Sequence, residues 1–109
     1  MRKFAFILMG PQFHPEIHQA AFETPGMCSF IRTARNFEEA KEEVLRLAGE
    51  GVGAIEICGA FGPERARELI ALTKNQVAIG YVTHFEEQNR LFDLFFGKAG
   101  EHSEPSRID

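Results

Sequence analysis

The sequence of 109 residues has no tryptophan, one tyrosine and only two cysteines, Cys28 and Cys58. Small secreted domains usually depend on several disulfides, so two cysteines without a C-x-x-C or zinc spacing indicate reduced thiols and a cytoplasmic protein. The apolar run Phe4 to Met9 is shorter than a signal-peptide core of about 7–15 residues, and no run approaches the roughly 20 residues of a membrane span. We therefore expect no membrane partner.

Runs of basic residues are also absent. Lysine and arginine number 12 against 16 acidic residues, a formal charge of -4. That balance argues against a dedicated nucleic-acid binder. The apolar fraction of 44% and the short length indicate one globular domain. We expect the domain to span residues 1–97 and the polar residues 98–109 to form a flexible tail.

Apolar periodicity and capping residues predict an alternation of strands and helices. Asn36 with Glu39, and Thr83 with Glu86, have the spacing of a helix-capping box, and Pro15 suits a first helical position. We expect strands at 4–9, 28–33, 53–59 and 77–82, and helices at 13–24, 37–48, from Gly62-Pro63 to about 74, and in the last segment before Gly97.

This order predicts an α/β fold. The expected architecture is a four-stranded, mainly parallel sheet with (βα)4 order and helices on both faces, in which the strands near 4–9 and 54–58 are parallel neighbours. A ferredoxin-like α+β sheet is the alternative if residues 14–24 form a loop.

Four segments carry a resemblance to a known family. They are KFAFILMGP, RNFEEAKEEV, GVGAIEICGAFG and VAIGYVTH, and together they extend over roughly residues 3–97. They resemble a family of short, uncharacterised bacterial proteins classed as a domain of unknown function. The resemblance implies a compact α/β domain with no established activity, and it assigns no catalytic residue.

Candidate catalytic residues gather near the carboxyl ends of the predicted strands, where parallel sheets bind ligands. His84 is a candidate acid–base group, Cys58 a nucleophile and Glu56 a base or orienting acid. Cysteine is also a common small residue of buried positions, and an inert thiol is the favoured interpretation of Cys58. Strand alternation places Glu56 and Cys58 on one face, where a carboxylate removed from water needs a partner. Glu56 therefore either pairs with Arg32 as a structural ion pair or faces a pocket.

The turn after Cys58 is a candidate anion site. Its residues Gly59, Ala60, Phe61 and Gly62 lead into a helix and offer backbone N–H groups, with Arg32 nearby. The turn lacks the ending of a phosphate-binding P-loop. The leading functional hypothesis is binding, or turnover, of a small polar or anionic metabolite at the carboxyl edge of the sheet; no reaction type or cofactor follows.

Two further hypotheses compete with this one. His14 and His18 have the i, i+4 spacing of a metal-binding pair, although Pro15 separates His14 from the expected helix. Phenylalanine supplies 11 of the 12 aromatic residues. Several lie on the last predicted helix, whose broad apolar surface predicts a symmetric homodimer. The chain would then be a non-catalytic oligomerising or regulatory module. The residues of that surface are Leu91, Phe92, Leu94, Phe95 and Phe96.

Overall fold

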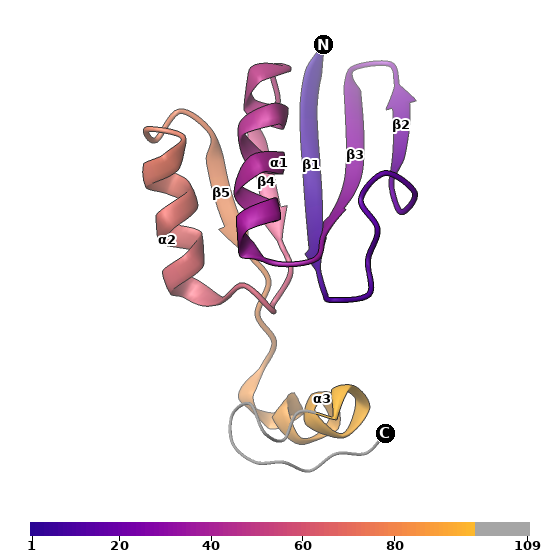
Figure 1. Ribbon diagram of the computed structural model, residues 1–109, viewed down its shortest axis with the longest axis vertical. Coiled ribbons are helices and arrows are strands. Elements are labelled where there is room, and N and C mark those ends of the chain that lie inside the picture. Colours follow the sequence, from indigo (N-terminus) through magenta and orange to yellow (C-terminus); the bar gives the residue numbers. More distant parts are fainter. Residues whose placement is uncertain (98–109) are drawn as a thin grey trace.

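The computed structural model describes residues 1–97, which form one α/β domain (Figure 1). The strands are β1 (Arg2–Met9), β2 (Ala20–Thr24), β3 (Met27–Ala34), β4 (Ala54–Ile57) and β5 (Ala78–Tyr81). The helices are α1 (Phe37–Gly49), α2 (Gly62–Leu72), a short 3-10 turn η1 (Glu86–Gln88) and α3 (Asn89–Phe96). In this part of the chain no helix has the length and apolar character to cross a membrane.

The sheet has five strands in the order β2-β3-β1-β4-β5. Strands β1, β3, β4 and β5 are parallel, and β2 is antiparallel to β3. The predicted parallel pairing of the first strand with the 54–58 strand is confirmed, with Phe4 opposite Ala54 and Ile7 opposite Ile57. Because four strands are parallel, the ferredoxin-like alternative is wrong.

The predicted helix over 13–24 is also wrong. Residues 14–18 form a turn in which the amides of Ile17 and His18 both donate to the carbonyl of His14 (2.9 and 2.8 Å). The following residues form β2, whose backbone groups pair with β3. The helical spacing of apolar residues misleads here because Ile17 is 69% exposed and has no core to face. The four-stranded (βα)4 order is therefore replaced by a mixed five-stranded sheet.

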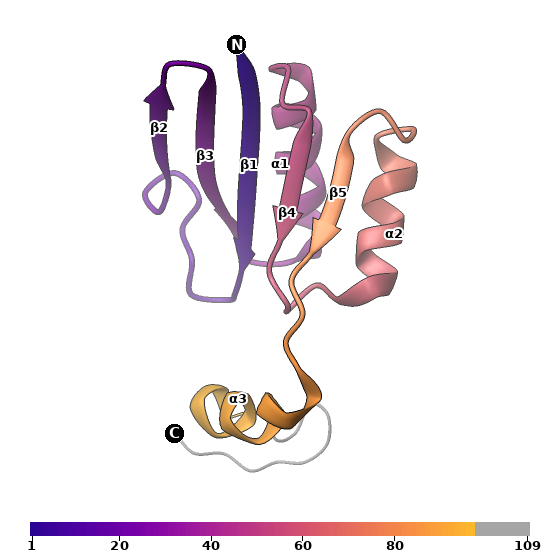
Figure 2. The same ribbon diagram turned by 180° about the vertical axis from the view of Figure 1, so that it is seen from behind.

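Both large helices cover the same face of the sheet, whereas helices on both faces were expected. Helices α1 and α2 contact each other; α1 lies in front of the strands in Figure 1 and behind them in Figure 2, and α2 lies beside β5. The segments β3-α1-β4 and β4-α2-β5 step across the sheet in the same direction, so right-handed crossovers put both helices on one side. The most deeply buried large side chains lie between these helices and the sheet, and they come from both layers: Ile7, Val44, Leu47, Ile55, Ile57 and Leu69.

Helix α3 lies apart from the sheet, beyond the carboxyl ends of its strands (Figures 1 and 2). The capping box predicted for Thr83 and Glu86 does not form: Phe85 precedes η1, Gln88 precedes α3, and neither side chain caps a helix. The reason is that the extended backbone continues past β5 to Phe85. Gly97 ends α3 in the left-handed conformation, as expected. The tail predicted for 98–109 lies outside the described residues.

The N-cap of α1 yields a stability prediction. The Asn36 side chain accepts a hydrogen bond from the Glu39 amide (2.9 Å), as the sequence predicts. Asn36→Ala leaves that amide without its partner, so we expect a loss of about 1 kcal/mol in the free energy of unfolding. Asn36→Ser keeps an acceptor and should retain most of the stability. Urea denaturation of both variants provides the measurement, and equal losses in both would contradict the capping role.

Candidate functional site

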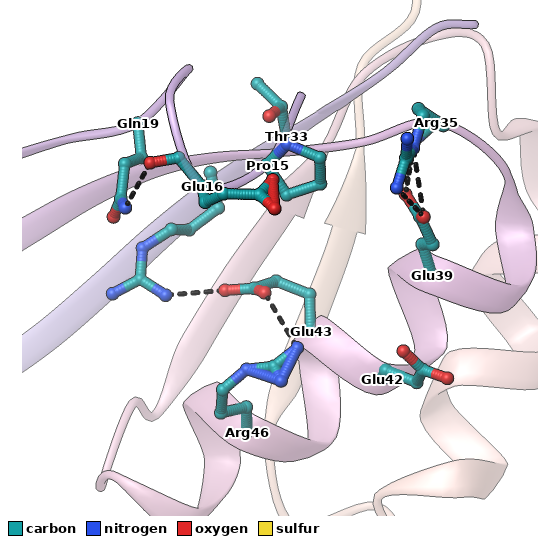
Figure 3. Close-up of a pocket in the computed structure, with 10 residues that line it drawn as sticks. Pro15, Glu16, Gln19, Thr33, Arg35, Glu39, Glu42, Glu43 and Arg46 are labelled. Carbon is teal, nitrogen blue, oxygen red and sulfur yellow. Dashed lines mark hydrogen bonds and ion pairs between the residues drawn. The ribbon is translucent and has the colours of Figure 1, made fainter. Parts of the chain in front are cut away.

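A charged groove lies beside the carboxyl end of β3. Strand β2 pairs with β3 only from Met27 to Ile31, so the last residues of β3 have no β2 neighbour. The loop that precedes β2 and the helix α1 flank this gap and enclose a hollow of about 390 Å³ (Figure 3). Its lining residues are Pro15, Glu16, Gln19, Arg32, Thr33, Arg35, Glu39, Glu42, Glu43 and Arg46.

A largely buried ion pair joins β3 to α1 in the groove. Arg32 on β3 and Glu43 on α1 are 2.5 Å apart, with side chains only 17% and 9% exposed. The Arg32 guanidinium also lies over the Phe30 ring, 4.9 Å from its centre, which adds a cation–π contact. Within residues 1–97 the Nε of Arg32 is shielded from water and has no hydrogen-bond partner. The pair therefore fixes Arg32 without using all of its donors.

Arg46 holds the second oxygen of the same carboxylate. Its guanidinium is 3.2 Å from Glu43 Oε1, while Arg32 contacts Oε2. Figure 3 shows Arg46 beside Glu43 on α1, across the groove from Pro15 and Glu16. Unlike Arg32, Arg46 has a side chain that is 54% exposed. One carboxylate thus orients two guanidinium groups, and Arg46 keeps donors accessible from solvent.

A second arginine–glutamate pair lies at the end of the groove. Arg35 donates through Nε and Nη2 to Glu39 Oε2 (3.0 and 2.7 Å), and its backbone amide donates to Oε1 (2.9 Å). The side-chain hydrogen bond from Arg35 lowers the pKa of Glu39, helped by the bond from the Arg35 amide. The same side-chain hydrogen bond raises the pKa of Arg35, and the charge of Glu16 adds to that increase.

The groove is lined by side chains of both positive and negative charge, three arginines and four glutamates. The carboxylates of Glu16 and Glu42 have no hydrogen bond or ion pair within the described chain, whereas Glu39 and Glu43 are both paired. An isolated anion would meet a small excess of negative charge here. The arrangement suits a molecule that carries groups of both signs.

The predicted pair of Glu56 with Arg32 is wrong, and so is the expected burial of Glu56. Arg32 points toward α1 and Glu43, while Glu56 is exposed on the opposite face of the sheet. Its carboxylate lies against Gly80, where an added Cβ would be 2.6 Å from Glu56 Oε1. The carboxylate avoids the cost of burial because no helix covers that face.

The other predicted catalytic residues are engaged in different places. Cys58 follows the end of β4, packs against the core rather than sharing the face of Glu56, and accepts a hydrogen bond from the Met9 amide at Sγ (3.3 Å). His84 lies after β5, where its Nε2 is 2.7 Å from Asn89 Oδ1 and its ring stacks on Phe92 at 4.0 Å. These contacts tie each residue to a different neighbour.

The remaining predicted sites also differ from expectation. In the 59–62 turn, the amide of Phe61 donates to the Cys58 carbonyl (3.1 Å) and its ring is buried edge-on against Phe37. His14 and His18 belong to a turn rather than a helix, and His18 Nδ1 accepts from the His14 amide (2.9 Å). Across residues 1–97, no three His, Cys, Asp or Glu side chains are grouped to hold a metal ion.

Of the predicted ligand residues, only Arg32 lines the groove. Its ion-pair partner Glu43 was not among the predicted site residues. A signal for Glu43 exists in the sequence. It lies three residues after Ala40 and four before Leu47, within the apolar stripe of α1, where a carboxylate requires a cation opposite. The contribution of the 10–19 loop depends on the path of β2, which the sequence pattern misassigns.

Comparison with known proteins identifies the chain at the level of its family. Residues 2–97 match the model of the Family of unknown function (DUF6506). The chain belongs to this family. The match spans nearly all of the described domain of this DUF6506 chain, including the groove and α3. Neither the curated proteins nor the solved structures contain a match.

The buried pair predicts an asymmetric mutational response. Glu43→Gln leaves the Arg32 guanidinium largely withdrawn from water without its counter-charge, and we expect a loss of about 3–5 kcal/mol in unfolding free energy. Replacing both residues, as Arg32→Met with Glu43→Leu, should recover much of that loss because no unpaired charge remains. Chemical denaturation of the single and double variants tests this. A double variant less stable than Glu43→Gln would show that the pair itself stabilises the fold.

The pKa of Glu39 can be followed by NMR titration of its side-chain carboxyl carbon. We expect a value below the ordinary 4.5, and Arg35→Ala should raise it toward that value. A carboxyl whose pKa is lower in the folded state stabilises the protein above its unfolded-state pKa, and that contribution is lost as pH falls through the folded-state pKa. Wild type should therefore lose its stability advantage over Arg35→Ala under acidic conditions.

Proposed function

We propose that this chain binds a small polar metabolite in the charged groove beside β3. The observation that carries the proposal is the convergence of Arg32 and Arg46 on one carboxylate, Glu43, in a hollow of about 390 Å³. Small-molecule sites commonly have volumes of about 300–1,000 Å³ and a few oriented polar groups. The shared carboxylate holds the guanidinium groups in place before a ligand arrives, which reduces the ordering cost of binding.

The charges of the lining favour a zwitterionic ligand, such as an α-amino acid. A guanidinium has five N–H donors, and Arg46 remains half exposed while it forms an ion pair with Glu43, so it can also bind a ligand carboxylate. The free carboxylates of Glu16 and Glu42 lie in the same lining and suit an ammonium group. A ligand with only negative charge would bring no partner for these two glutamates. This narrows the expectation of a small polar or anionic metabolite at the carboxyl edge of the sheet to a zwitterionic one.

The groove supports binding more directly than turnover. Its ten lining residues include no histidine and no cysteine, and Glu56, Cys58 and His84 are not among them. Carboxylates and arginines orient and neutralise a ligand. The function proposed is therefore recognition of a small metabolite. The proposal includes no catalytic role for Glu56, Cys58 or His84.

The test is thermal denaturation and calorimetric titration with the standard amino acids, matched dicarboxylates and diamines. At least one amino acid should raise the melting temperature in a saturable way, since a ligand that binds only the folded state stabilises it. Arg46→Gln should weaken that binding at least about tenfold, because a charge-assisted contact contributes about 1.5–3 kcal/mol. Arg67→Gln is the matched control, because Arg67 is exposed on α2 and does not line the groove, and it should leave the affinity unchanged.

Two results would contradict the proposal. One is the absence of binding by every amino acid at millimolar concentration. The other is equal binding by wild type and Arg46→Gln, which would place the ligand outside the groove.

A further inference from the structure

The face of the sheet opposite α1 and α2 is apolar and uncovered. Ala5 and Ile7 face the helices and are fully buried, so the alternating residues of β1 project to the other side. The register extends this open face across the neighbouring strands. Figure 2 looks onto it, and no drawn element of residues 1–97 lies in front. Its main apolar residues are Phe4, Phe6, Leu8, Phe22, Ile31 and Ala54.

Helix α3 is a second apolar surface without a covering. It has only eight residues, yet Phe95 and Phe96 are 77% and 66% exposed, and Phe85 before it is 77% exposed. An isolated helix this short is marginal in water and requires tertiary packing for stability. Its aromatic rings are already ordered among themselves, with Phe95 edge-on to Phe96 at 4.9 Å. The helix therefore needs an apolar surface of about its own size, and the open face is one.

The connection from β5 directs α3 away from its own sheet. The chain is extended up to Phe85, and residues 82–88 contain no glycine, proline or asparagine that would favour a tight reversal. His84, which lies in this connection, contacts α3 through Asn89 and stacks on Phe92. To cover its own open face, α3 would have to reverse its direction in the short connection between β5 and His84. A second copy can supply the same face without that reversal.

Charge and area agree with a second copy as the occupant. The strand residues of the open face carry two charges, Arg2 at its amino end and Glu56 near its carboxyl end. Helix α3 carries Arg90 and Asp93, and neither Arg90 nor Glu56 has an ion-pair or hydrogen-bond partner within residues 1–97. A buried phenylalanine removes about 150–250 Å² from water, so two exchanged helices and the faces they cover reach the roughly 1,200–2,000 Å² of stable interfaces.

We propose that the chain forms a symmetric homodimer in which α3 of each copy lies across the open face of the other, with Arg90 beside Glu56 of the partner subunit. The exchange is reciprocal, so both open faces and both helices are covered at once and no free copy of either surface remains to extend the assembly. The interface lies on the opposite side of the sheet from α1, and the proposal stands independently of ligand binding in the groove.

The first experiment is sedimentation velocity of the full chain from 1 to 100 µM. Wild type should sediment as a dimer. Phe95→Ser with Phe96→Ser should raise the dimer dissociation constant at least about thirtyfold, the effect of losing a central aromatic contact. Leu45→Ser is the matched control: Leu45 is 49% exposed on α1 and should leave the dimer unchanged. Circular dichroism should show that the sheet domain stays folded in both variants.

The second experiment separates exchange between copies from folding back within one chain. Glu56→Arg alone brings two cations together, and Arg90→Glu alone brings two anions together, so each should weaken its homodimer about tenfold or more. Mixing the two single variants should restore a tight heterodimer, because each helix then meets a face of opposite charge. Native mass spectrometry distinguishes the heterodimer by mass.

The proposal is overturned by a wild type that is monomeric at 100 µM, whether α3 then covers its own sheet or binds a different partner. It is also overturned by a dimer that survives the double Phe→Ser replacement, or by mixed charge variants that form no heterodimer while the chain carrying both reversals is restored. The last pattern would show that Arg90 and Glu56 meet within one chain.

Discussion

The handedness of the connections between parallel strands controls how this sheet is covered. Both crossovers start at β3 or β4 and move toward β5, and right-handed crossovers that move in one direction place their helices on one face. Coverage of the other face would require a crossover in the opposite direction. The step from β1 toward β3 has that direction, but it is occupied by a turn and the antiparallel strand β2. The bare face follows because β2 stands where a crossover helix would otherwise cover the sheet.

The same replacement creates the groove. Because β2 joins β3 only as far as Ile31, the backbone beyond it faces the loop rather than another strand. The Thr33 hydroxyl donates to the His18 carbonyl (2.9 Å), which anchors the loop to the end of β3. On the other wall, Glu43 anchors α1 through Arg32. These two polar contacts therefore fix the loop and α1 to β3 on either side of the groove.

The sequence predicts the elements that have a hydrophobic period and a strong local signal. Helix α1 has an apolar stripe and an Asn36 cap, and the buried strands β1 and β4 are apolar on their helix-facing side, so their positions and parallel pairing were predictable. Strand β2 was missed because all of its residues are exposed, and an exposed edge strand carries no burial pattern to read. That single error had large consequences for the site. With a helix predicted over residues 13–24, the loop that lines the groove was not predicted. The same helix was expected to cover the face on which Glu56 is exposed.

Glu56 shows why the chemistry of a residue cannot be inferred from its strand alone. Alternation correctly placed it opposite Ile55 and Ile57, but whether that face is buried depends on crossovers elsewhere in the chain. On a covered face the carboxylate would need a cation from the same domain. On a bare face it remains hydrated in one copy, and it becomes a determinant of recognition once another surface approaches. Under the two proposals, the polar groove beside α1 binds the ligand and the apolar face on the other side of the sheet binds a second copy. A ligand can occupy the groove while the opposite face is covered.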